Sequence, residues 1–148
     1  MTRELLALNH SLMIEMIRKC GKSNDEIINV LMEGNAESFQ PFGEGIPDWE
    51  TFIQYYESNP IKMKNAIYHG FKVTFLTKGA LKMLLKIKFN LHEGEDFIDT
   101  GETLENMKLS FESHRELQEM ISSNWRIIAK QQTSSTIAIK IQLANQSL

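Results

Sequence analysis

Cysteine, proline and long apolar runs are all scarce in this chain of 148 residues. Cys20 is the only cysteine, so an internal disulfide is impossible. The three prolines and eight glycines form no linker-like tract, and no apolar run approaches the roughly 20 residues that span a bilayer. The N-terminus also lacks the apolar core of a secretory signal. We therefore expect no membrane span and a reducing, cytoplasmic location.

The sequence patterns of several common chemistries are missing too. There is no glycine-rich phosphate loop, no H-E-x-x-H or C-x-x-C zinc pattern and no G-x-S-x-G elbow. We predict no cofactor and no metal site, and we interpret Cys20 as a buried structural residue. Enzymatic activity stays open, because catalytic groups need only meet in space. The histidines that such a site would draw on are widely separated: His10, His69, His92 and His114.

The composition that remains is that of an ordinary globular protein, with 42% hydrophobic and 24% charged residues. Apolar residues at steps of three and four predict a helix over residues 3–20. The S-x-x-E pattern at Ser23 predicts a capping box that opens a second helix ending near Gly34. Residues 35–46 read as a loop. A third helix begins at Pro47, and a short fourth one runs from Pro60 to Gly70.

The periodicity changes to that of strands after Gly70, over residues 71–75, 85–91, 107–111 and 137–141. A helix over 113–130, opened by a second capping-box pattern, separates the last two strands. These elements predict an α+β fold, in which N-terminal helices precede a β-β-β-α-β antiparallel sheet with one covering helix. We expect one domain over 1–148, with a possible helical subdomain over 1–69 and an α+β part over 70–148.

Residues 77–84 fit two structures. They form either a hairpin turn between two strands or the start of a helix, because Ala80, Leu81, Leu84 and Leu85 also follow helical spacing. Gly79 favours the turn.

Charge is distributed in blocks along the chain. Residues 1–57 carry four cations against ten acids, residues 58–92 carry seven lysines and no acid, and residues 93–148 carry five cations against nine acids. The middle block indicates a surface for nucleic acid or for an acidic partner, or simply the solvent-facing side of amphipathic strands that the acidic segments neutralise. The candidate binding residues are Lys62, Lys64, Lys78, Lys82, Lys86 and Lys88.

Aromatic residues gather near the proline-containing loop. Helical spacing assigns Trp49, Phe52 and Tyr56 to the inner side of the third helix. Phe39, Phe42 and Tyr55 fall outside that stripe, and we predict that they form a protein contact surface or an oligomer seam.

Three hypotheses for function follow from these patterns. The leading one is a non-enzymatic regulatory or interaction protein that binds a macromolecular partner, or a second copy of itself, through a charged surface. The first alternative is a winged-helix-type nucleic-acid-binding protein that uses the lysine-rich segment 62–88, with Lys62 and Lys64 on the fourth helix and Lys72 to Lys88 as the wing. The second alternative is a small enzyme with a site at the helix–sheet junction, using His69 or His92.

Overall fold

In the computed structural model, which describes residues 3–145, the chain forms two compact units. The first runs to Lys72 and the second begins at Val73. The first unit is mainly helical and the second combines helices with a four-stranded sheet, so the α+β class is confirmed. The predicted single domain stays a prediction, since a compact unit need not fold alone.

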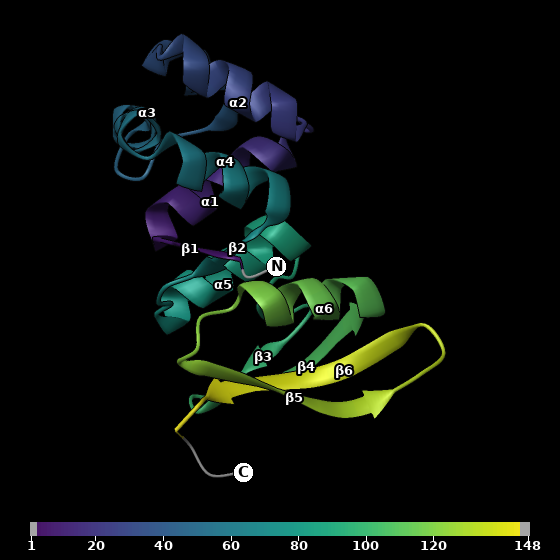
Figure 1. Cartoon of the computed structure of the whole chain (residues 1–148). Helices are drawn as coiled ribbons and strands as arrows, with labels where there is room; N and C mark the ends of the chain where they lie inside the picture. The colour runs from purple at the N-terminus through teal and green to yellow at the C-terminus, as the bar shows by residue number, and fades with distance from the viewer. Residues whose placement is uncertain (1–2, 146–148) are drawn as a thin grey trace. The chain divides into compact units, whose positions relative to one another are not determined.

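Residues 3–73 form four α-helices, one 3₁₀ helix and two short strands, the second of which ends at Val73, the first residue of the second unit (Figure 1). Strands β1 and β2 form a two-stranded sheet of their own. In chain order the elements are β1 (Glu4–Leu6), α1 (Leu8–Lys19), α2 (Asn24–Glu33), the 3₁₀ helix η1 (Ala36–Phe42), α3 (Trp49–Ser58), α4 (Pro60–His69) and β2 (Phe71–Val73).

Local capping sets most of these boundaries, as the sequence predicts. Ser23 accepts a hydrogen bond from the Glu26 amide at 3.2 Å, and the Glu26 carboxylate accepts one from the Ser23 amide at 2.9 Å. This capping box opens α2, and Gly34 closes it in the left-handed conformation, at φ 69°. Pro60 occupies the first turn of α4, where its missing N–H costs nothing.

Two predictions for this unit need correction. The helix predicted over 3–20 begins only at Leu8, because the preceding residues are extended and pair with β2. The predicted loop over 35–46 contains η1, which begins with a hydrogen bond from the Glu37 amide to the Asn35 side chain at 3.0 Å.

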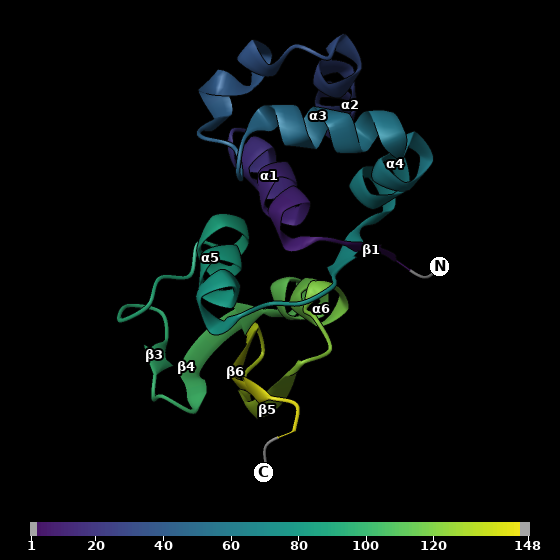
Figure 2. The ribbon, with the colours of Figure 1, turned by 90° about the vertical axis from the view of Figure 1, so that its left-hand side faces the viewer.

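The second unit places two helices on one side of an antiparallel sheet of order β3-β4-β6-β5 (Figures 1 and 2). Its sheet core consists of alternate residues from β4 and β6, among them Leu104, Met107 and Ile139, which are almost fully buried. The elements are α5 (Lys78–Phe89), β3 (Ile98–Asp99), β4 (Thr103–Ser110), α6 (Phe111–Met120), β5 (Trp125–Gln132) and β6 (Thr136–Leu143).

The strand predicted over 85–91 is wrong, because these residues belong mostly to α5. The Thr77 side chain accepts a hydrogen bond from the Ala80 amide at 3.2 Å and caps the helix, and Asn90 ends it in the left-handed conformation. Thus residues 77–84 start a helix, and no hairpin turn forms there. The buried residues Leu81, Leu84 and Leu85 follow helical spacing, which outweighs the strand-like alternation of lysines further on.

The predicted helix over 113–130 is correct only in its first half. Ser110, three residues earlier than predicted, is the N-cap of α6, and it accepts a hydrogen bond from the Ser113 amide at 3.1 Å. The helix ends at Met120, and Trp125 begins β5, which pairs with β6 along its whole length. The Trp125 indole donates to the Leu76 carbonyl at 2.8 Å, so the predicted large anchor is present but lies on a strand.

The sheet of the second unit therefore differs from the predicted β-β-β-α-β order. The first predicted strand shortens to β2 and pairs with β1, the second is α5, and β5 is an additional strand. The predicted strand over 137–141 is confirmed within β6. The predicted strand over 107–111 ends at Ser110 within the longer β4.

Candidate functional site

The lysines at the start of α5 bind the acidic loop that follows the helix. Lys82 Nζ lies 2.6 Å from Asp99 Oδ2 and 2.9 Å from Glu93 Oε1. Lys78 Nζ lies 3.3 Å from Asp99 Oδ1 and donates to the Gly101 carbonyl at 2.7 Å. The hydrogen bond from Lys82, together with that from the Gly101 amide, holds the pKa of Asp99 well below its usual range. These two predicted binding lysines therefore fasten a loop within their own unit.

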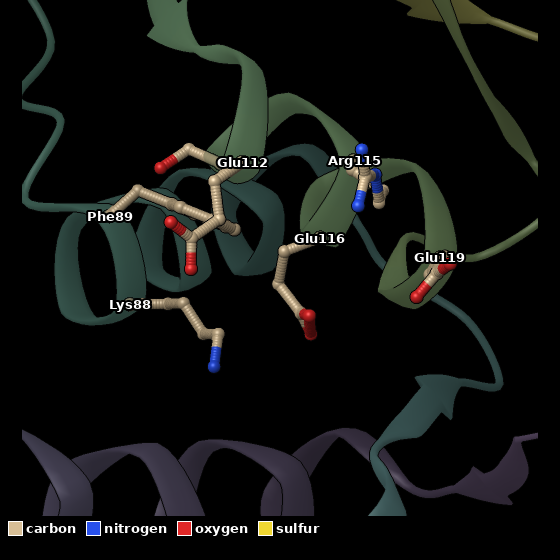
Figure 3. Close-up of a pocket in the computed structure, with 7 residues that line it drawn as sticks. Lys88, Phe89, Glu112, Arg115, Glu116 and Glu119 are labelled. Atoms are coloured by element: carbon tan, nitrogen blue, oxygen red, sulfur yellow. The ribbon is translucent and has the colours of Figure 1, made fainter.

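Lys88, another predicted residue, lines a charged groove of about 350 Å³ between the end of α5 and the start of α6 (Figure 3). Figure 3 shows its ammonium group near the carboxylates of Glu112 and Glu116. The remaining lining residues are Phe89, Ser113, Arg115 and Glu119. Because this groove holds three carboxylates against two cations, it offers no net positive surface.

The other predicted lysines are spread over two elements. Lys62 and Lys64 lie on α4 of the first unit, whereas Lys86 is exposed on α5 of the second. The predicted wing of the winged-helix alternative does not form, because residues 78–89 are the helix α5, whereas nucleic-acid binding by these lysines stays a prediction.

The predicted aromatic contact surface is also largely wrong. Phe39 is completely buried and Phe42 is 9% exposed. Phe39 stacks on Trp49 with ring centroids 5.0 Å apart, so both phenylalanines belong to the core of the first unit. Tyr55 is half-buried and stacks on the imidazole of His10 at 4.2 Å. The prediction placed Phe39 and Phe42 outside the core because they do not belong to the apolar stripe of α3. Helix η1 packs against α3, however, and this packing buries both side chains.

His10 is the one buried histidine of the described chain. Its side chain is 6% exposed, and its Nδ1 atom has no hydrogen-bond partner among residues 3–145. Burial lowers the pKa of this imidazole, because the charged form would lose its hydration. His10 is therefore a neutral core residue at neutral pH, although sequence reasoning gave it no role.

The histidines proposed for an enzyme site lie in different surroundings. His69 is exposed at the end of α4. His92 is half-buried in the second unit, and its Nε2 lies 2.9 Å from Asn90 Oδ1. Within residues 3–145, no group of three or more histidine, cysteine, aspartate or glutamate side chains is arranged to hold a metal ion. Cys20 is exposed, which corrects the prediction of a buried structural cysteine.

A second groove, of about 560 Å³, lies where the strands β4, β5 and β6 change register. Both shifts flank the same stretch of β6, and Asn106 adopts a positive φ of 62° at the first of them. The groove is lined by Glu95, Asp96, Asn106, Lys108, Gln131 and Ala138. Its only cation, Lys108, shares the groove with two carboxylates, so this groove offers no net positive surface either.

The charge imbalance of the second unit lies instead on its last two strands. No aspartate or glutamate follows Glu119 in the sequence, whereas Arg126, Lys130 and Lys140 do. These three cations lie on β5 and β6, and we call them the cationic hairpin. Neither Lys130 nor Lys140 forms an ion pair with a residue in 3–145.

Sequence reasoning missed the cationic hairpin because the large acidic excess of residues 93–119 hides it in the block total. The signal that would have revealed it is the absence of acids from residue 120 onward. The prediction of a helix over 113–130 also placed Arg126 and Lys130 on the wrong kind of element.

No helix in the described part of the chain has the length and apolar character needed to cross a membrane. Comparison with protein families, with curated proteins and with solved structures finds no match to this chain.

Proposed function

We propose that this protein is a non-enzymatic interaction protein that binds an anionic macromolecular partner through the cationic hairpin. The observation that carries this proposal is the contrast between two sets of cations. Lys78 and Lys82 lie within 3.3 Å of carboxylates of their own unit. Lys130 and Lys140, by contrast, lie on strands that carry no acid at all.

Paired and unpaired cations differ in how strongly they attract an anionic partner. Cations that are already paired attract a further anion only weakly, because the neighbouring carboxylates repel it. Lys130 and Lys140, which pair with no carboxylate of residues 3–145, keep more of their field and steer an anionic partner toward themselves. The position of the hairpin supports this role, since β5 is an edge strand of the sheet, where a partner can approach it.

Charge reversal tests the proposal. The probes are fluorescein-labelled polyglutamate and a labelled 16-base-pair DNA duplex, with binding followed by fluorescence anisotropy at 50 and 200 mM NaCl. Lys130 is exposed and Lys140 half-buried. Two reversed charges, each worth about 0.2–1 kcal/mol, should together weaken anion binding by roughly tenfold in Lys130→Glu/Lys140→Glu.

The matched control is Lys64→Glu/Lys86→Glu, which makes the same change in net charge at two exposed lysines on helices. Its binding should change less than threefold. The proposal is wrong if neither probe binds at 50 mM NaCl, or if the two double variants lose affinity equally, since net charge alone would then explain the binding.

A further inference from the structure

β5 has no second strand neighbour among residues 3–145. β5 is eight residues long and stands at the end of the order β3-β4-β6-β5, with β6 as its only strand partner among residues 3–145. Alternate amides and carbonyls of an edge strand point away from its one neighbour, and they can form a ladder with another extended chain.

Apolar side chains along this edge are also left partly exposed to solvent. Ile127 pairs with Ile141, so both side chains lie on the helix-facing side of the sheet. Ile141 is completely buried, yet Ile127 is only half-buried and Ala129, further along the same side, is exposed. Helix α6 packs mainly over β4 and β6. An added strand with apolar residues on this side would cover the remaining surface.

The cations near β5 determine which kind of strand can pair with its edge. On the other side of the sheet Arg126 and Ile128 pair with Gln142 and Lys140, and Lys130 lies at the register shift between Ala129 and Gln131. A second copy would offer these cations no carboxylate, since β5 carries no acid, and if paired antiparallel about Ile128 it would set Arg126 opposite Lys130, where like charges destabilise a sheet. An incoming strand with carboxylates on this side would instead find complementary charge.

The register shift limits the length of the added strand. Regular pairing of β5 with β6 runs from Trp125 to Ala129 and is interrupted before Gln131. Such an irregularity, combined with an exposed lysine, discourages pairing along the second half of an edge. The regular part of the edge is therefore five residues, Trp125–Ala129, of which the Trp125 amide already donates to the Ser122 carbonyl at 3.2 Å.

We propose that the edge Trp125–Ala129 binds a short extended segment of an acidic protein as an additional β-strand, with apolar residues toward the helices and carboxylates toward Arg126 and Lys140. This inference rests on the proposed function, and it names the partner and the mode of binding. Backbone hydrogen bonds would supply affinity, and alternate side chains would supply specificity.

The test uses three synthetic peptides and the intact protein. The first is fluorescein-labelled acetyl-(Val-Glu)₄-amide, which alternates apolar and acidic residues at strand period. The second has the same sequence with every backbone nitrogen methylated, so it keeps the charge but cannot donate to a ladder. The third is acetyl-(Val-Lys)₄-amide, which reverses the charge. Anisotropy gives the affinities, and NMR hydrogen exchange gives the protection of individual β5 amides.

We expect the first peptide to bind and to slow amide exchange within Trp125–Ala129 at least tenfold. The methylated and lysine peptides should bind at least tenfold more weakly. Lys130→Glu/Lys140→Glu should weaken binding of the first peptide, and Lys64→Glu/Lys86→Glu should leave it within threefold.

Each opposing result overturns a different claim. Equal binding of the methylated peptide, without protection of β5 amides, means that anions bind by charge alone and strand addition is wrong. Binding of the 16-base-pair duplex but of no peptide makes nucleic acid the partner, and it overturns strand addition while the proposed function stands. Binding of no anionic probe overturns both.

Discussion

Replacing Gly79 with alanine distinguishes the helix α5 from the hairpin turn that the sequence also allows. Gly79 lies in the first turn of α5, its φ is not positive, and a Cβ atom built on it meets nothing within 4 Å. Alanine loses less backbone entropy than glycine on entering a helix, which stabilises a helix interior by roughly 0.5–1 kcal/mol. Because the site is close to the helix start, we take the lower value, about 0.5 kcal/mol.

For a unit of this size, that change raises the Tm by about 2–4 °C. It should also slow hydrogen exchange of the Leu84 and Leu85 amides about twofold, since exchange there requires the helix to open. The matched control is Gly101→Ala, where φ is 99° and the space around the Cβ position is equally open. Strain in this backbone region costs about 1 kcal/mol or more, so the control should lower the Tm. A lower Tm for Gly79→Ala would refute the helical assignment.

Three further predictions concern stability. Asp99→Asn should lower the Tm at pH 7, and the difference in Tm from wild type should shrink as the pH falls below about 4. The reason is that a carboxylate with a lowered pKa stabilises the fold only while it is ionised. A loss of Tm that does not depend on pH would contradict the role of the Lys82 ion pair. In wild type, the unfolded state binds a proton on His10 below pH 6.5 whereas buried His10 in the folded state resists protonation, so the free energy of unfolding falls between pH 7 and 5. His10→Phe should reduce this fall in urea titrations. An unchanged dependence of the free energy of unfolding on pH would contradict the role of His10. Phe39→Ala should destabilise the first unit by about 3–5 kcal/mol in the same titrations, whereas a change below 1 kcal/mol would mean that Phe39 lies outside the core.

The elements predicted correctly are those whose signals are local. The capping box of Ser23 and Glu26 satisfies its own amides within one turn, and Pro60 fixes the start of α4 without help from distant residues. The strict alternation of Ile137, Ile139 and Ile141 allows one side of a strand to be buried, and β6 follows it. These residues carry the information for their structure in their immediate neighbours.

The candidate site could not be predicted in the same way, because its charges are defined by partners distant in sequence. Lys82 is neutralised by Asp99 and Glu93 only when the loop folds back onto α5. Lys130 and Lys140 lack ion pairs with described residues only because β5 and β6 pair with each other at the edge of the sheet. A count of charges over large blocks of the chain does not separate these two situations, although the absence of acids after Glu119 points to the second.

By itself, the sequence determined the α+β class, the starts of α2 and α4, and the acid-free final segment. The tertiary structure decided the rest. Residues 85–89 alternate as a strand would, but burying Leu81, Leu84 and Leu85 together favours a helix. Residues 125–132 form β5, whose pairing with β6 accompanies the burial of Trp125 and its hydrogen bond to the Leu76 carbonyl. Where a local pattern fits two structures, the long-range burial and pairing that only one of them allows make the choice.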